Sequence, residues 1–470
     1  MARAVAFEAM NSPSCGLDVH KDMIEACVID GSGGKHRKTS GTMRQSLYAL
    51  RDWILSLSCF HVLMESTGVY WIPVYEILEE AKGMDVGVGN AGKMKQAPGR
   101  PKTDKADADW IARLCMVGFI LKSFVAGREY RELREYTRYH KKLVQERARQ
   151  ASQIEKLLQM NGFKLSSVLS DITGASGMKL LRVLCDKGSV TLAEVQGALH
   201  WRVKKSAQEI ESAINGQIKQ TSRLLLGKML SRLERCEAEA AEIYKMMVGM
   251  SQSSRAQIEQ LKGVPGIGEL SAIYIIAEIS ADMSSFRTSR HIAAWAGLAP
   301  KDSGSAGRLK SSRTKKANAY VKSILTECAW AATRARGTRL SNWYWRNAKR
   351  LGDKKAITAV ARKLLVYIYA MLKSGEPYDD SLDAADTEKR EAWKLDSARK
   401  IVEHRSNGAA AQKHPGNMQQ GAAGPVSPLL RPETGAQPAA GAPAPPGPPK
   451  KRGRPRKEAG AAKGTASQLA

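Results

Sequence analysis

The first part of the chain alternates short apolar runs with helical patterns. Residues 15–30 (CGLDVHKDMIEACVID) predict a strand, a bend and a second strand. The apolar run within 59–66 (CFHVLMES) predicts a third strand, and 84–90 (MDVGVGN) a short fourth one. Between these two, residues 74–82 have helical periodicity. Strands interleaved with helices predict an α/β layered domain.

Beyond this region the pattern becomes helical. Residues 128–160 repeat apolar positions at helical spacing without Gly or Pro, which predicts one long helix. A second helical run follows at 207–247, after a looser stretch. We interpret the two runs as antiparallel helices of a coiled-coil arm. A plain helical bundle is the alternative, and the densely charged surfaces favour the arm.

The remainder divides into a basic helical region, 251–378, and a tail from about residue 380. The tail is rich in Ala, Gly, Pro and Gln and is predicted to be disordered. Within it, Arg452 and Arg454 lie in an Arg-Gly-Arg core resembling an AT-hook, which fits a narrow A·T minor groove. The alternative is a basic tail that only improves solubility.

The net charge of the chain indicates what kind of partner it binds. The 470 residues suggest about three domains. They carry 74 Lys and Arg against 46 Asp and Glu, a net charge of +28, so nucleic acid is the expected partner. Residues 301–376 hold half of this excess. Aromatic residues interleave there as on a stacking surface: Trp330, Trp343, Tyr344 and Trp345.

The sequence predicts neither a membrane or secreted protein nor a zinc site. No run of 18 apolar residues occurs, so a membrane span is excluded, and the first residues do not resemble a secretory signal. The seven cysteines form no CxxC pair. They predict reduced, mostly buried thiols in a cytoplasmic protein, without a zinc site.

Four acids are the main candidates for chemistry. Asp18 lies in the first predicted strand and Glu65 ends the third. Asp104 and Asp107 share a helical stripe with apolar residues, so both should face the protein. Buried carboxylates without a His or Cys cluster suit Mg²⁺ or Mn²⁺. Each acid alone could be a strand-end or helix-start residue, but their order matches an RNase H-like fold.

Two further segments contain candidate binding residues. Gly266 and Gly268, in Val-Pro-Gly-Ile-Gly, predict a helix-hairpin-helix whose backbone approaches a phosphate, with an ordinary Gly-rich turn as the alternative. Residues 297–308 place serines in a Gly/Ala-rich loop and thus suggest a nucleophile, although Ser and Gly also fill ordinary loops. The cations beside them could hold phosphate: Arg308, Lys310, Arg313, Lys315 and Lys316.

Together these motifs resemble the DEDD transposases of insertion-sequence family 110 over about residues 14–378. The resemblance rests on GLDVHK, MESTGVYW, KTDKADA, VPGIGELSA and GLAP…SAG…K…N-Y. It implies a RuvC-like catalytic domain (1–125), a helical coiled-coil linker (126–250) and a serine-bearing transposase domain with the helix-hairpin-helix (251–378). The basic tail (379–470) departs from the family pattern.

The resemblance also implies a mechanism. Family members are similar to recombinases that are guided by a structured RNA from their own element and exchange DNA strands as dimers or tetramers. The family's Ser matches Ser305, with Ser303 as the nearby competitor. The alternative function is a RuvC-like structure-specific endonuclease, which needs the acids and Mg²⁺ but no Ser. A third possibility is a non-catalytic chromosome-organising protein.

Overall fold

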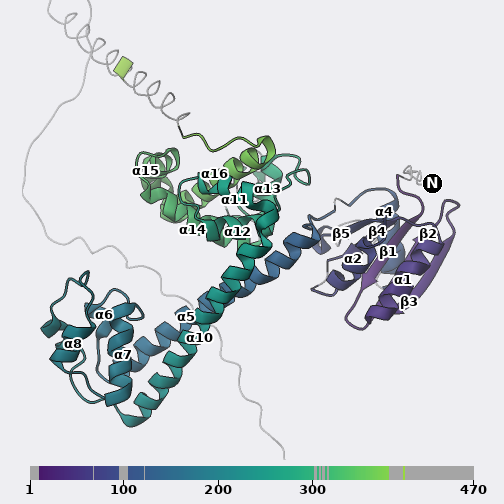
Figure 1. Ribbon diagram of the computed structural model, residues 1–470. Helices are drawn as coiled ribbons and strands as arrows, with labels where there is room; N and C mark the ends of the chain where they lie inside the picture. Colours follow the sequence, from purple (N-terminus) through teal and green to yellow (C-terminus); the bar gives the residue numbers. More distant parts are fainter. Residues whose placement is uncertain are drawn as a thin grey trace, which may run out of the picture. The chain divides into compact units, whose positions relative to one another are not determined.

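The computed structural model describes residues 10–66, 68–94, 104–120, 122–300, 304–305, 308–309, 313–314, 317–380 and 395–396. The chain divides into two units, Met1–Glu391 and Ala392–Ala470. The first contains one five-stranded sheet followed by a long series of helices (Figure 1). The predicted disorder of the tail and the roles of Arg452 and Arg454 lie outside the described residues.

The sheet has the strand order β3-β2-β1-β4-β5. Its strands are β1 (Ser14–Val19), β2 (Met23–Ile29), β3 (Lys35–Gly41), β4 (His61–Glu65) and β5 (Asp85–Gly89). β1, β2 and β3 pair antiparallel, whereas β4 lies parallel to β1 and β5 parallel to β4. The four predicted strands are confirmed. β3 was not predicted, because its sequence KHRKTSG is polar and it forms an edge with one buried residue.

Helices cover both faces of this sheet. On one face, α1 (Arg44–Ser56) and α2 (Trp71–Glu79) enclose an apolar core that includes Leu17 and Met64. On the other face lies α4 (Asp104–Met116), reached after the short α3 (Ala91–Met94). This layering confirms the predicted α/β architecture and is consistent with a RuvC-like domain.

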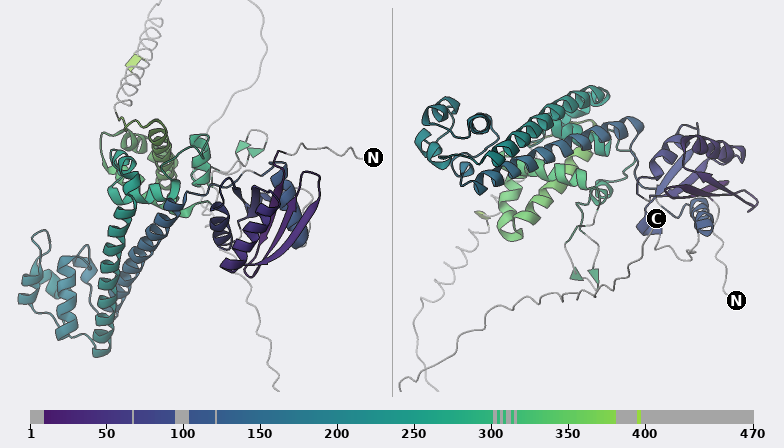
Figure 2. Two further views of the ribbon diagram at one scale, coloured as in Figure 1. Left: turned by 45° about the vertical axis from the view of Figure 1, so that its right-hand side comes forward. Right: turned by 90° about the horizontal axis from the view of Figure 1, so that it is seen from below.

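Two long helices, α5 (Arg128–Met160) and α10 (Gln220–Met250), lie side by side (Figures 1 and 2). α5 confirms the predicted helix. Leu133 near the start of α5 shares a core with Met247 near the end of α10, so the two run antiparallel. The coiled-coil interpretation itself stays a prediction.

The second helical run differs from the prediction. It is not continuous over 207–247, because α9 (Ala207–Ala213) ends before Gly216, whose φ of +120° is incompatible with a helix. Three further helices fill the looser stretch: α6 (Leu165–Val168), α7 (Ala175–Lys187) and α8 (Leu192–Ala198). Together with α9 they pack against the C-terminal half of α5 and the N-terminal half of α10. The core that they share includes Ile154, Leu181 and Leu226.

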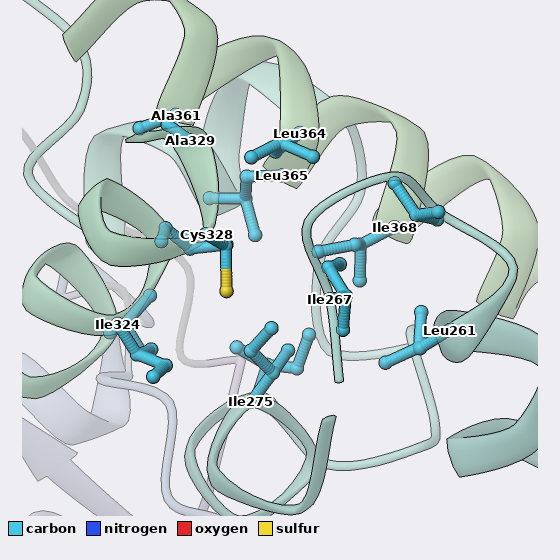
Figure 3. Packing of buried hydrophobic residues seen from close by; sticks show 14 of the residues in the cluster. Leu261, Ile267, Ile275, Ile324, Cys328, Ala329, Ala361, Leu364, Leu365 and Ile368 are labelled. Atoms are coloured by element: carbon cyan, nitrogen blue, oxygen red, sulfur yellow. The ribbon is translucent and has the colours of Figure 1, made fainter. Parts of the chain in front are cut away.

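The last part of the first unit is helical, as predicted. It contains η1 (Gln252–Ser254), α11 (Arg255–Lys262), α12 (Glu269–Ile279), α13 (Ser289–Trp295), α14 (Ala319–Arg334), α15 (Arg339–Leu351) and α16 (Asp353–Ser374). Two short strands, β6 (Gly304–Ser305) and β7 (Arg308–Leu309), pair between α13 and α14. Figure 3 shows the core, in which Ile275, Cys328 and Leu365 meet.

The cysteines agree with their predicted state. All seven are free; Cys185 is half-buried and the others are buried. Burial raises the pKa of Cys115 to about 12, and burial together with a nearby Asp109 carboxylate does the same for Cys27. Among the described residues, no helix is long and apolar enough to cross a membrane.

Candidate active site

Asp18 and Glu65 occupy neighbouring positions on two parallel strands. The register pairs Leu17 of β1 with Met64 of β4, so the next residue along each strand is one of these acids. Leu17 and Met64 face the core under α1 and α2, and side chains alternate along a strand. Both acids therefore lie on the opposite face, which α4 covers. Both are buried, and Glu65 is the last residue of β4.

α4 brings a third acid to this end of the sheet. The hydroxyl of Ser14 donates to the carbonyl of Ala112 (3.2 Å), whereas Gly16, further along β1, lies against Ala108 as well. β1 and α4 therefore run in opposite directions. The first turn of α4 lies towards the end of β1 that contains Asp18. Asp107 in this turn is half-buried.

The apolar members of the predicted stripe on α4 are buried. Ile111 and Leu114, which follow Asp107 on one side of α4, are both buried. The side chain of Asp104 lies outside the described residues. Within the part of the chain that the structure describes, no group of three or more His, Cys, Asp or Glu side chains is placed to hold a metal ion.

Two polar residues beside Asp18 were not selected from the sequence. Glu25 of β2 is directly opposite Asp18 in the antiparallel register and is also buried; it accepts a hydrogen bond from the Thr39 hydroxyl (2.8 Å). The Nε2 atom of His20 lies 3.0 Å from Asp18 Oδ2. Glu25 could have been selected from the sequence, because a two-residue turn at the predicted bend pairs positions 18 and 25 of the two strands.

Asp109 is a further acid that the sequence analysis missed. Arg37 of β3 donates to both of its carboxylate oxygens (2.9 and 2.6 Å), and Lys35 Nζ donates to Oδ2 (2.8 Å). Hydrogen bonding from the Arg37 guanidinium holds the pKa of Asp109 well below its usual range. These bonds fasten α4 to the antiparallel edge of the sheet, next to Asp107.

The Val-Pro-Gly-Ile-Gly segment forms a turn between α11 and α12. Gly266 has φ +90°, and a Cβ there would lie 2.5 Å from the carbonyl oxygen of Cys328 on α14. Close helix packing therefore requires this glycine. Gly268 is exposed at the start of α12, but the adjacent Glu269 accepts a bond from Arg255 (2.5 Å) at this helix end. A phosphate-binding role for Gly266 and Gly268 stays a prediction.

The serine segment is described only in part. The β6–β7 pair contains the backbone of Ser305 and Arg308, whose side chains lie outside the described residues. The same holds for the whole of Ser303, Lys310, Lys315 and Lys316, while Arg313 is exposed. The segment ends at Asn318, whose side chain accepts bonds from two backbone N–H groups of α14 and so caps that helix.

The predicted aromatic stacking surface needs correction. Tyr344 is buried in the helical core, and its hydroxyl donates to Asp353 (3.1 Å). Trp343 is half-buried beneath Lys363, whose Nζ lies 5.4 Å from the ring centroid. Only Trp330 and Trp345 of the four aromatic residues are exposed. Consecutive helix positions point in different directions, so a run of aromatic residues cannot share one surface.

Two family models match this chain, one over the sheet and α5 and one over the later helices. Residues 15–161 match a family model for DEDD transposases of the IS110 type, described as a transposase. Residues 258–345 match one described as the transposase IS116/IS110/IS902 family. The chain is 23% identical over 371 residues to the transposase for insertion sequence element IS1111A of Coxiella burnetii, covering 77% of this chain and 90% of that protein.

Two shorter matches cover the relatives less completely. A probable family 20 transposase of Pseudomonas aeruginosa is 28% identical over 152 residues, which are 32% of this chain and 44% of the relative. A pilin gene-inverting protein of Moraxella bovis is 31% identical over 122 residues, 25% of this chain and 38% of the relative. With both its sheet and its later helices matched, the chain belongs to the IS110 family of transposases.

Proposed function

We propose that this transposase is a site-specific DNA recombinase that moves its own element, and that Asp18, Glu65, Asp104 and Asp107 act as one catalytic unit. The adjacency of Asp18 and Glu65 on parallel strands, beneath the first turn of α4, supports this most directly. Two buried carboxylates side by side repel each other, so a cation bound between them would stabilise this arrangement.

The donor set fits Mg²⁺ or Mn²⁺, because carboxylate oxygens are the ligands that these ions prefer. When bound, such an ion would stabilise the charge on attacking and leaving oxygens at a phosphodiester. The chain itself supplies the placement: Gly16 allows α4 to approach β1, and Asp109 holds α4 against β3.

Ser305 is proposed as the covalent nucleophile, with Ser303 as its competitor. Its hydroxyl would attack the scissile phosphorus and lose its proton, and the strand would depart as a free DNA hydroxyl. The phosphoserine ester keeps the bond energy, so another DNA hydroxyl can reverse the step and join a new strand. Cations around the serine would offset the developing charge: Arg308, Lys310, Arg313, Lys315 and Lys316.

The remaining assignments rest on the family resemblance. They are a catalytic domain over 1–125, a linker over 126–250 and a serine-bearing domain over 251–378. The element's own structured RNA would guide target choice, in a homodimer or homotetramer acting on DNA in the cytoplasm. The net charge of +28 supports a nucleic-acid partner.

A covalent trap tests the serine step. A nicked DNA substrate, whose cleaved fragment diffuses away, should accumulate a protein–DNA adduct with the wild-type protein and none with Ser305→Ala. Ser303→Ala is the matched control and should form the adduct normally. Asp107→Asn should bind DNA without forming it, because Asp107 is proposed to act at the reacting phosphate.

The endonuclease alternative predicts the opposite. A Ser303/Ser305 double-alanine variant that still cleaves DNA would favour hydrolysis by water, and normal strand exchange by that variant would remove the serine mechanism. The Moraxella bovis relative is named for inverting a pilin gene, which favours recombination, since inversion requires rejoining. A purely structural DNA-binding protein would bind the substrate but would neither cleave it nor form an adduct, even as the wild type.

A further inference from the structure

The stretch from the end of α14, through α15, to the first turn of α16 carries a strong positive charge. Residues 334–355 contain eight Lys or Arg and a single acid, Asp353. The carboxylate of Asp353 accepts the Tyr344 hydroxyl (3.1 Å). We call the α15 face the surface formed by Arg336, Asn342, Trp345, Arg346, Lys349 and Arg350, all exposed except the half-buried Asn342. Such a charge is complementary to a polyanion.

Trp345 is the aromatic residue on this face, and its position is fixed. Its side chain is 62% exposed, yet Nε1 donates to the carbonyl of Thr333 (3.3 Å). The ring also meets the buried Tyr344 edge-on, with centroids 5.2 Å apart and planes at 80°. These two contacts hold the ring while most of its surface stays open to a ligand.

A hollow adjoins the exposed ring. Arg336, Gly337, Ser341, Asn342 and Trp345 line a volume of about 330 Å³. This is near the lower end of the range for small-ligand pockets, about 300–1,000 Å³. The Asn342 amide donates to the carbonyl of Gly337 (3.3 Å), which fixes the turn that forms the wall. A planar ring bound there could stack on Trp345 beside a guanidinium.

We propose that the α15 face binds an unpaired stretch of a DNA strand, with one base stacked on Trp345 in the hollow and backbone phosphates on Lys349 and Arg350. A base within a duplex is already stacked on both sides, so a tryptophan ring can stack only on an unpaired one. Strand exchange by a transposase creates such bases. The inference rests on that activity but not on Ser305.

Equilibrium binding of the full-length Ser305→Ala protein tests this, because binding is then read without any cleavage or adduct. The probes are a fluorescent single-stranded DNA, the corresponding duplex and a single-stranded RNA of the same sequence. Trp345→Ala should weaken single-stranded DNA binding about 5- to 150-fold. Duplex binding should be unchanged, and Trp345→Phe should retain most of the affinity.

Trp201 offers a matched control. It is 80% exposed and stacks with Arg202 (4.7 Å from the ring centroid), but it lies between α8 and α9. Trp201→Ala should leave single-stranded DNA binding unchanged. If Trp345→Ala impairs folding, Lys349→Gln with Arg350→Gln serves instead. That double variant should flatten the salt dependence by about 0.7 for each phosphate that it no longer neutralises.

Three results would overturn the proposal. Unchanged single-stranded DNA binding in Trp345→Ala would remove the stacking role. An equal loss on the duplex would make the effect general. A loss confined to the RNA probe would assign the α15 face to an RNA instead. Failure of the serine mechanism would appear only in the adduct experiment, so the two are distinguishable.

Discussion

The buried carboxylate of Glu278, on α12, accepts a hydrogen bond of 2.7 Å from the side-chain amide of Asn318, the residue that caps α14. Arg138 of α5 donates two further bonds to Glu278, at 2.8 and 3.1 Å. Arg134 lies 3.3 Å from the same carboxylate. One buried acid therefore joins α5 and α12 to the end of the segment that follows Ser305.

We expect Glu278→Ala to destabilise the protein by about 3 kcal/mol, because it leaves two arginines near the core without their anion. Urea unfolding monitored by circular dichroism would measure the loss as a lower midpoint. Glu327→Ala is the matched control: Glu327 also pairs with α5, through Lys141 (3.4 Å), but is well exposed. Its cost should stay below about 1 kcal/mol. Equal costs would contradict the anchoring role.

Gly16→Ala should displace α4. The new Cβ would overlap the Ala112 nitrogen and the Ala108 oxygen, both of which are backbone atoms that cannot rotate away. Overpacking of this kind costs about 1–3 kcal/mol. Gly31→Ala, whose Cβ would meet only Ser12 Oγ at 3.8 Å, should be neutral. Thermal unfolding of the two variants compares them, and an unchanged Tm in Gly16→Ala would be inconsistent with the close approach.

The Asp109 pairs should make stability depend on pH. Because the folded-state pKa of Asp109 is lowered, its contribution is complete above the unfolded pKa of about 4 and is lost as pH falls further. Asp109→Asn should therefore be less stable than wild type at pH 7, by about 1–3 kcal/mol. The gap should narrow below pH 4. A constant gap across urea titrations at pH 7 and pH 3 would refute the ionic contribution.

Glu25 should tune the proposed metal site from the adjacent strand. Glu25→Gln keeps an acceptor for Thr39 but removes a negative charge opposite Asp18. The Mg²⁺ concentration for half-maximal strand exchange should rise about tenfold, with the rate at saturating Mg²⁺ preserved. Thr39→Val, which frees the Glu25 carboxylate, should shift the requirement less. A lost maximal rate with an unchanged Mg²⁺ requirement would argue against this assignment.

The basic tail should add general DNA affinity. Each phosphate contact steepens the dependence of log affinity on log salt by about 0.9, so deleting residues 446–470 should flatten that slope. An Arg452→Ala/Arg454→Ala variant should reproduce part of the effect if the Arg-Gly-Arg core makes the contacts. Choice of the recombination site should persist, and its loss on truncation would give the tail a specific role. Binding isotherms at several salt concentrations measure both.

Local patterns were sufficient where an element has a periodicity of its own. The apolar runs that predicted β1 and β2 and the long helical repeat that predicted α5 are confirmed. β3 was not predicted because an exposed edge strand needs no apolar face, and it forms a strand only by pairing with β2. The break in the second helical run at Gly216 was also not predicted. One residue with positive φ ends a helix without changing the apolar pattern around it.

The sequence identifies the candidates for chemistry: the four acids, the serines, and the cations around them. Which side chains lie together depends on the tertiary structure. Asp18 and Glu65 are adjacent because two strands distant in sequence pair in one register, and Asp109 meets Arg37 because α4 crosses β2 towards β3. It also buried Tyr344 and left Trp345 exposed, although the two are neighbours in sequence. Side-chain identity is a local property, whereas register, helix crossing and burial depend on contacts between distant parts of the chain.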